Sequence, residues 1–343
     1  MQFDTYTDWA DLPAGASELF ARQEAESLFL TRPWFENLTA HALADGESPL
    51  LACVHEAGRV LALLPLIDHG GAYATALSTS ISTRYSVLLG ENAGPGVLER
   101  LALGLRSLPL ASYRLEPILP EDDALIALGA ALRARGFTEE RFFRYYNWVE
   151  RLNGRGYADY WAERPSRVRN TVSRKQRRLK REHGCDIRLY TDKNIDTALA
   201  DYQAVEQASW KAREQHARFI AHLVRDAARL GWLRLAVLYV DERPIAAQIW
   251  FVVGRKANIF RLSYDQAFES WSPGSILTRF LMEQVIDHDG VKEIDFLNGD
   301  ERYKADWMSL RRDCMALAFH APPAASASGP GWRQRMQRLF GRD

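Results

Sequence analysis

The chain has 343 residues, of which 47% are hydrophobic and 11% aromatic. This composition excludes a disordered protein, and the length predicts about two domains. The 44 basic and 44 acidic residues cancel, so attraction to a polyanion must come from local clusters of charge. Three distant cysteines and eight histidines show no disulfide framework or metal-ligand spacing. Because no metal-ligand spacing is present, no bound metal is expected. The acidic start Met1–Asp4 and the lack of a run of about 18 apolar residues favour a cytoplasmic protein.

The first half of the chain alternates strand-like and helix-like patterns. Period-two hydrophobicity around an acidic turn predicts a hairpin. In chain order we expect a hairpin over 50–66 with its turn at 56–59, strands near 73–77 and 85–89, a helix over 96–107, a strand near 113–117, a helix over 122–135 and an aromatic strand over 141–149.

The second half repeats this order after a joint at Gly154-Arg155-Gly156. We expect a helix over 157–183 broken at Pro165, helix over 195–229, strands over 233–239, 245–253 and 257–264, a helix over 275–289 and a strand over 292–297. The repeat predicts an α/β (α+β) protein with two tandem units, 1–150 and 151–320, each with a mixed, mostly antiparallel sheet flanked by helices. A chance similarity between two α/β segments is the alternative.

The composition changes after His320. Residues 321–343 are expected to form a flexible small-residue linker and a short basic amphipathic tail over 332–342. One helical face of this tail carries Trp332, Met336, Leu339 and Phe340. We expect it to dock the protein at the inner membrane face or on a partner protein.

A turn at 271–275 opens the expected helix over 275–289. Pro273 suits a turn, Gly274 permits close backbone approach, and Ser275 is a favourable helix cap. The N–H groups of a helix start bind phosphate, so we expect Ser272, Gly274, Ser275 and Ile276 to hold the phosphates of a donor. An ordinary capped helix is the alternative.

The polar segment 298–307 follows directly after a strand, where α/β proteins place their sites. Lys304 is expected to stabilise an oxyanion and Tyr303 to protonate a leaving group, and Asp300 is a candidate to bind or deprotonate an amine. Trp307 is a further candidate to contact substrate. The alternative is a solvated turn followed by a core tryptophan.

A basic run extends from Arg164 to Arg181 with almost no acidic residue inside it. Its valines and Leu179 provide a thin apolar seam, so one side packs on the body and the rest forms a positive ridge suited to phosphates. A solvated helix is the alternative. The residues expected to bind substrate here are Arg167, Arg169, Asn170, Arg174, Arg177 and Arg178.

The hairpin, the Ser-Pro-Gly turn, the strand ending in Asp295–Asp300, and Tyr303-Lys304 resemble the GNAT-type acyltransferases of the BioF2-like group. That group includes proteins of cellulose and exopolysaccharide biosynthesis and is related to the Fem peptidoglycan aminoacyltransferases. The resemblance implies two tandem GNAT units with a degenerate first copy. It also implies that Tyr303-Lys304 takes the family's aromatic-Lys role in binding the substrate carbonyl or acceptor end.

The same resemblance implies an N-acyltransferase with acyl-CoA, such as acetyl-CoA, as co-substrate. Its acceptor is an amine on a small-molecule, nucleotide-linked or lipid-linked envelope precursor. The turn 271–276 departs from the Q/R-x-x-G-x-G/A loop of CoA-using enzymes because it has a single glycine. Two alternatives therefore stay open: a Fem-like enzyme that uses aminoacyl-tRNA, and an inactive binding module of an envelope-synthesis complex.

Overall fold

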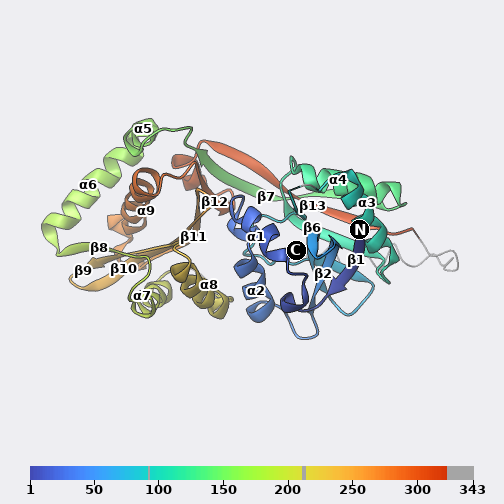
Figure 1. Ribbon diagram of the computed structural model, residues 1–343. Helices are drawn as coiled ribbons and strands as arrows, with labels where there is room; N and C mark the ends of the chain where they lie inside the picture. The colour runs from blue at the N-terminus through green and yellow to red at the C-terminus, as the bar shows by residue number, and fades with distance from the viewer. Residues whose placement is uncertain (92, 211–213, 323–343) are drawn as a thin grey trace.

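The computed structural model describes residues 1–91, 93–210 and 214–322. Within them the chain forms one large, mostly antiparallel sheet flanked by helices (Figure 1). The strands run in the order β1-β2-β3-β4-β6-β13-β7-β12-β11-β10-β9-β8, and β5 pairs with β3 beside this path. The expected mixed α/β architecture is confirmed. The calls on the tail over 332–342 fall outside the described residues.

The strands are β1 (Gln2–Tyr6), β2 (Ser48–Glu56), β3 (Arg59–Asp68), β4 (Tyr73–Ala76), β5 (Leu88–Leu89), β6 (Ser112–Ile118), β7 (Thr138–Arg151), β8 (Cys185–Tyr190), β9 (Leu233–Val240), β10 (Arg243–Val253), β11 (Lys256–Tyr264), β12 (Glu293–Asn298) and β13 (Leu310–His320). The α-helices are α1 (Ala16–Glu24), α2 (Arg32–His41), α3 (Pro95–Ser107), α4 (Asp123–Ala134), α5 (Tyr157–Glu163), α6 (Ser166–Glu182), α7 (Ile195–Gln207), α8 (Ala217–Arg229) and α9 (Pro273–Glu283). None of the helices among the described residues has the length and apolar character that crossing a bilayer requires.

Both halves contain the same succession of hairpin, strand, helix and parallel strand. In the first half α3 connects the parallel pair β4 and β6, and in the second half α9 connects the parallel pair β11 and β12. The halves then exchange their last strands. β7 of the first half pairs with β12 of the second, while β13 of the second half lies between β6 and β7. Figure 1 shows the long strands β7 and β13 running between the elements of the first half and those of the second. The two halves therefore share one continuous sheet.

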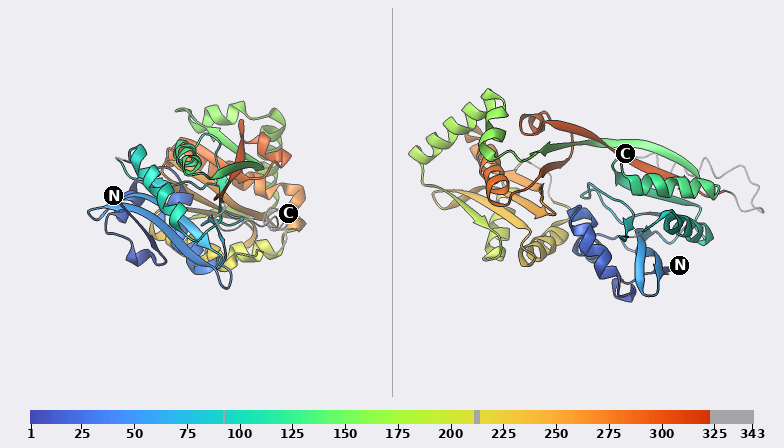
Figure 2. Two further views of the ribbon diagram at one scale, coloured as in Figure 1. Left: turned by 90° about the vertical axis from the view of Figure 1, so that its right-hand side faces the viewer. Right: turned by 45° about the horizontal axis from the view of Figure 1, so that its top comes forward.

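The second half packs helices on both faces of the sheet. Along β9, Leu235, Val237 and Tyr239 join the core under α7 and α8. The alternate residues Ala236 and Leu238 join a second core with α5, α6 and α9. This alternation is the period of two that a strand buried on both faces shows. Figure 2 shows α6 and α9 on one side of this part of the sheet and α7 and α8 on the other.

The helix expected over 195–229 is wrong in one respect, because α7 and α8 are separate helices. Glu214, just before α8, lies against the sheet, where its carboxylate accepts a hydrogen bond from Arg261 Nε at 2.7 Å. A continuous helix would carry Glu214 away from this partner. The break therefore brings polar groups to the ends of the central strands.

Candidate active site

The strands β11 and β12 form a fork. They pair in parallel only from Lys256–Glu293 to Asn258–Asp295, and both strands then continue without pairing to each other, as far as Tyr264 and Asn298. The register of β11 against β10 shifts at Phe260, which is a β-bulge beside the opening. Backbone groups of β11 and β12 that would pair in a closed sheet thus face the opening.

A cavity of about 430 Å³ occupies this fork. Residues 259–263 of β11 and 296–298 of β12 form its two sides, and Glu301, Tyr303 and Lys304 close one end. The first half of the chain contributes Ser80, Ile81 and Thr83. The remaining wall comes from Tyr202 and Glu206 of α7 and from residues 214–216.

Lys304 is the buried cation of this cavity, with 3% of the residue exposed. Its Nζ donates to the backbone carbonyl of Asn298, lies 3.0 Å from Glu301 Oε2, and lies 5.3 Å from the centroid of the Phe296 ring. A lysine ammonium has three N–H donors. Two of them are directed at these oxygens, so one remains for a ligand in the cavity.

Tyr303 lies beside Lys304, and its ring packs edge-on against Phe296 with centroids 5.5 Å apart. Tyr303 is 42% exposed, but partial desolvation of its hydroxyl, with a further contribution from the Glu301 carboxylate, raises its pKa above the ordinary value. The phenol is therefore protonated at neutral pH and can donate a hydrogen bond or a proton. The structure brings Tyr303 and Lys304 together in the fork.

Asp300 and Trp307 lie outside the residues that line the cavity. The Asp300 carboxylate accepts hydrogen bonds from Trp148 Nε1 at 2.9 Å and from Arg311 at 3.0 Å. Trp307 is buried in the core shared with α5, and its carbonyl accepts a hydrogen bond from the Tyr160 hydroxyl at 2.8 Å. The geometry thus gives Asp300 and Trp307 structural partners and leaves Tyr303 and Lys304 facing the cavity.

Several polar residues of the cavity were missed by sequence reasoning: Tyr202, Glu206, Glu214, His216 and Arg261. Burial alone would raise the pKa of Glu214, but the hydrogen bond and charge of Arg261 outweigh it, and the pKa is lowered. The backbone N–H of His216 adds to this effect. One signal was available, because residues 211–216 interrupt the apolar pattern of the expected helix with a polar run.

The start of α9 has the backbone features expected of a phosphate-binding site. Ser272 adopts a left-handed conformation with φ 52°, and Lys175 Nζ donates to its hydroxyl at 2.7 Å. The N–H groups of Gly274 and Ser275 belong to the first turn, where no preceding carbonyl can accept them. Ile276 differs, because its N–H donates to the Ser272 carbonyl and its side chain is buried in the core.

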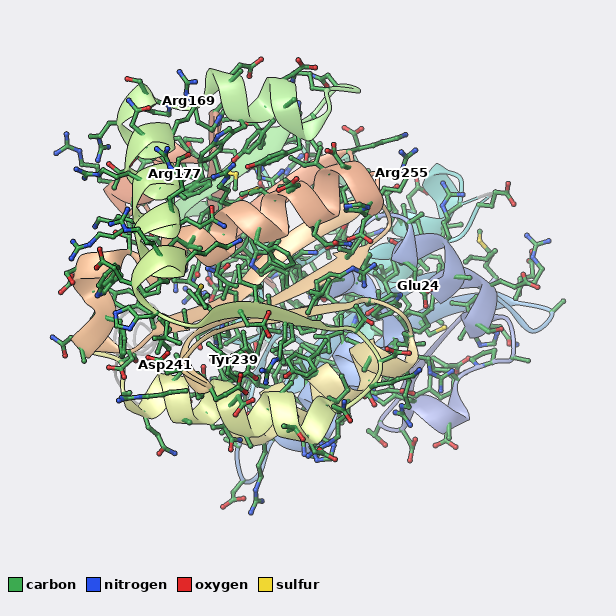
Figure 3. The ribbon with its side chains drawn as sticks, turned by 90° about the vertical axis from the view of Figure 1, so that its left-hand side faces the viewer. Glu24, Arg169, Arg177, Tyr239, Asp241 and Arg255 are labelled. Atoms are coloured by element: carbon green, nitrogen blue, oxygen red, sulfur yellow. The ribbon has the colours of Figure 1, made fainter. Side chains whose placement is uncertain are left out.

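Helix α6 places its basic residues on two sides. Val168, Val172 and Leu179 form the expected buried seam. Lys175 and Arg178 lie next to the start of α9, with the Arg178 guanidinium 4.5 Å from the centroid of the Trp271 ring. The side opposite the seam carries Arg167, Asn170, Arg174, Arg177 and Arg181. Figure 3 shows Arg169 and Arg177 on this outer helix.

Four of the expected substrate-binding arginines have protein partners. On α6 itself, Arg177 Nε donates to the Ser173 carbonyl at 3.3 Å and Arg178 Nε lies 3.0 Å from the Glu182 carboxylate. Arg167 lies 2.8 Å from the Asp306 carboxylate, and Arg169 Nε donates to the carbonyl of Arg164 at 3.1 Å. The structure therefore brings Arg178 and the α9 turn together. It leaves Asn170, Arg174 and Arg177 on the exposed outer side of α6, away from that turn.

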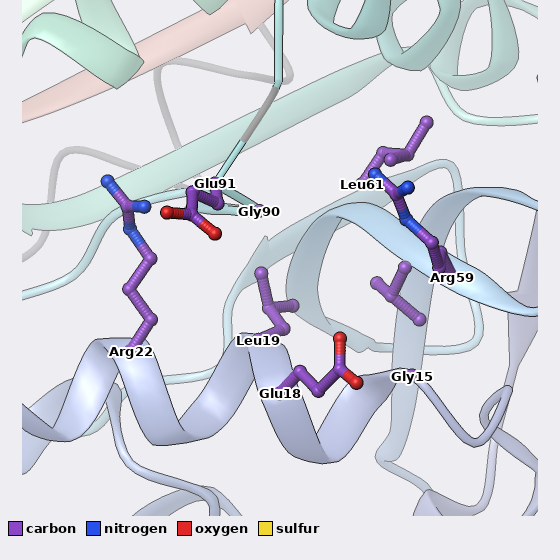
Figure 4. A pocket seen from close by; sticks show the side chains of 9 residues that line it. Gly15, Glu18, Leu19, Arg22, Arg59, Leu61, Gly90 and Glu91 are labelled. Carbon is purple, nitrogen blue, oxygen red and sulfur yellow. The ribbon is translucent and has the colours of Figure 1, made fainter.

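A second cavity, of about 500 Å³, lies in the first half between α1, the start of β3 and Gly90 (Figure 4). Its charged lining residues are Glu18, Arg22, Arg59 and Glu91, all of them exposed. It contains none of the residues expected from the sequence to act in chemistry. The cavity in the fork is therefore the candidate active site.

One comparison with known proteins matches the part of the chain that contains most of this cavity. Residues 166–305 match a family model described as an acetyltransferase (GNAT) domain, and this range contains the fork, α6 and Lys304. No curated protein sequence matches the chain.

Solved structures with similar folds include FemX, with a TM-score of 0.64, 11% identity, and coverage of 99% of this chain and 100% of that chain. L-PGS from Bacillus licheniformis has a TM-score of 0.52 and 13% identity, with 85% and 90% coverage. A tandem GNAT protein from the clavulanic acid biosynthesis pathway has a TM-score of 0.52 and 12% identity, with 94% and 100% coverage. At these identities the likeness establishes a shared fold.

The BioF2-like subgroup expected from the sequence is not distinguished by these matches. Residues 166–305 match the acetyltransferase (GNAT) domain model, and the chain shares the fold of a tandem GNAT protein.

Proposed function

We propose that the fork between β11 and β12 transfers an acyl group from an activated donor to an amine, and that Tyr303 and Lys304 carry the chemistry. The observation that supports this most directly is the buried Lys304 ammonium at the end of a cavity inside the GNAT domain. A fixed cation in a place of low exposure stabilises a developing oxyanion more strongly than one in water.

The reaction proceeds by direct attack, without a covalent enzyme intermediate. The amine nitrogen adds to the acyl carbonyl, and Lys304 donates a hydrogen bond to the resulting oxyanion. When the tetrahedral state collapses, the bond to the leaving thiolate breaks and Tyr303 supplies its proton. The proton lost by the amine passes to water or to a cavity carboxylate, Glu206 or Glu301. Asp300 orders the polar segment 298–307 through the hydrogen bonds that its carboxylate accepts from Trp148 and Arg311.

The donor is proposed to be an acyl-CoA, with acetyl-CoA as the simplest member. Its phosphates would contact the N–H groups of Gly274 and Ser275, with Ser272, Lys175 and Arg178 around them. The exposed arginines of α6, together with Asn170, extend this positive region along the helix. An extended arginine surface also suits a tRNA, so a Fem-like reaction with aminoacyl-tRNA is the second candidate.

The acceptor is proposed to be an amine on a cell-envelope or exopolysaccharide precursor, in the cytoplasm or at the inner membrane face. The shared fold with FemX and L-PGS supports this choice. A catalytically inactive binding module is the third reading.

The experiment that separates these readings uses the full chain. Native mass spectrometry identifies a retained donor, and release of free thiol from acetyl-CoA is followed with an envelope-precursor extract, before and after ribonuclease. We expect retained acyl-CoA and ribonuclease-resistant turnover. If no thiol is released from acetyl-CoA but the aminoacyl group of a labelled aminoacyl-tRNA is transferred, in a reaction that ribonuclease abolishes, the donor is aminoacyl-tRNA. A chain that binds neither donor would be a binding module.

A further inference from the structure

Leu297, in the wall of the fork cavity, has an uncommon backbone conformation. Its φ is 58°, in the left-handed region that bulky residues rarely adopt. The pairing register of β12 against β7 shifts at this point, between Asp295 and Asn298. A buried leucine keeps such a conformation only where its surroundings hold it.

Both peptide groups of Leu297 are held by side chains. Its N–H donates to Asp295 Oδ1 at 2.7 Å. Its carbonyl accepts a hydrogen bond from Asn147 Nδ2, on β7, at 2.9 Å. Asn147 Nδ2 also donates to Asp295 Oδ1 at 2.6 Å, so the two side chains fix each other.

Arg312, on β13, completes the arrangement from the other side of β7. In the sheet Asn147 lies opposite Asn298 of β12 on one side and opposite Arg312 of β13 on the other. Arg312 Nη2 donates to Asp295 Oδ2 at 2.8 Å, and its Nε donates to Asn147 Oδ1. Asn147 and Asp295 are buried, with 1% and 8% exposure. We call Asn147, Asp295 and Arg312 the Leu297 clamp.

The clamp acts on the residue that holds Lys304. The left-handed turn at Leu297 sets the direction of the next residue, and the backbone carbonyl of that residue, Asn298, accepts the hydrogen bond from Lys304 Nζ. We propose that the Leu297 clamp is a set of positioning residues that aims the Asn298 carbonyl at Lys304 and so fixes the ammonium in the fork. The importance of the clamp for catalysis rests on the proposed role of Lys304. The structural coupling between the clamp and the Lys304 ammonium does not depend on that role.

The coupling is tested without any substrate by reductive methylation of lysines and peptide mass spectrometry. In the wild type we expect Lys304, which is buried, to react slowly. Asn147→Ala removes both hydrogen bonds donated by the amide, and we expect Lys304 to react about tenfold faster, the factor that corresponds to losing one buried hydrogen bond. Lys175 and Lys292 in the same sample are the internal controls and should react at the wild-type rate. Arg312→Lys, which keeps the charge, is a second variant if Asn147→Ala does not fold.

A rescue variant separates positioning from general loss of stability. Glycine adopts positive φ without strain, so Asn147→Ala with Leu297→Gly should bring the reaction of Lys304 back toward the wild-type rate. Unchanged labelling of Lys304 in the clamp variants would overturn the proposal. Equal acceleration at Lys175, Lys292 and Lys304 would overturn it as well. Because labelling needs no donor or acceptor, these outcomes are independent of whether Lys304 proves essential for turnover.

Discussion

At the scale of single residues, the fork holds a buried lysine and a half-buried carboxylate by giving each a partner. Lys304 is held by the Asn298 carbonyl and by Glu301, and Glu214 is held by Arg261 and by the backbone N–H of His216. Charges in such places are stable only when they are paired and hydrogen-bonded. The pairs therefore contribute to the stability of the fold and also fix the polar lining of the cavity.

The lowered pKa of Glu214 predicts a dependence of stability on pH. Because the folded pKa lies below the unfolded value of about 4.3, the carboxylate contributes its stability above that pH. This contribution is lost as the pH falls through the folded pKa. Glu214→Gln should lower the free energy of unfolding by about 2 kcal/mol at pH 7. Urea denaturation should show the difference from wild type shrinking below about pH 4.

Glu99→Gln is the matched control, since Glu99 is exposed on α3. It should change the free energy of unfolding by less than about 0.5 kcal/mol both at pH 7 and at about pH 3.5. A Glu214→Gln effect that is the same at pH 7 and pH 3.5 would contradict the proposed origin of the pKa shift.

The sequence predicts part of this site for a physical reason. Tyr303 and Lys304 follow the end of a strand directly, so chain order alone places them at the edge of the sheet. Asp300 has the same sequence context but faces Trp148 and Arg311. Glu214 and Thr83 reach the cavity from distant segments, and no local pattern encodes that approach.

At the scale of elements, the helix α9 is positioned by a buried amide. Gln248, on β10, has no exposed surface. Its Nε2 donates to the Gly274 carbonyl at 2.9 Å and to Thr278 Oγ1 at 2.8 Å, while its Oε1 accepts from Trp250 Nε1 at 2.9 Å. These contacts attach the first turn of α9 to the sheet. They also set the direction of the N–H groups proposed to bind phosphate.

Gln248→Leu tests this attachment. Leucine has a similar volume but leaves the buried Trp250 N–H without its acceptor, which should lower the free energy of unfolding by about 1–3 kcal/mol. Gln203→Leu, at an exposed position of α7, is the control and should stay within about 0.5 kcal/mol of wild type in urea. Equal effects of the two substitutions would show that the Gln248 contacts contribute nothing.

Elements with a clear local pattern were predicted close to their observed bounds, including the hairpin β2–β3, the break at Pro165 and the strands β9 to β11. The strands β1, β8 and β13 were not predicted. Near its start β13 has the polar run Arg311-Arg312-Asp313, which lacks the hydrophobic alternation of a half-buried strand. Its conformation is set by pairing with β6 and β7, which are distant in sequence.

At the scale of the whole molecule, the exchange of β7 and β13 makes each half depend on the other. The expected division into a degenerate unit over 1–150 and an active unit over 151–320 stays a prediction about the origin of the chain. Physically, residues 1–150 alone would leave β6 and β7 without the strand between them. The core also crosses the division, since Trp34 of α2 packs against Phe219 of α8 with ring centroids 5.1 Å apart.

We therefore expect residues 1–150 and 151–322, produced separately, to lack cooperative folding. Unpaired strand edges and exposed apolar surface should make each piece aggregate. Co-expression should restore a soluble complex because the missing strands are then supplied. Far-UV circular dichroism and urea denaturation test this, and a cooperative transition in either isolated piece would contradict the interdependence.

The measurement that tests the central claim most directly is the turnover of Lys304→Met with the donor identified by mass spectrometry. Lys193→Met, at an exposed position before α7, is the matched control. We predict that kcat falls by about 100-fold to 1000-fold in Lys304→Met, as for loss of an oxyanion donor, while the KM of the donor and the circular dichroism spectrum stay close to wild type. The control should keep the wild-type kcat. A folded Lys304→Met protein with wild-type turnover would contradict acyl transfer by Lys304 in the fork.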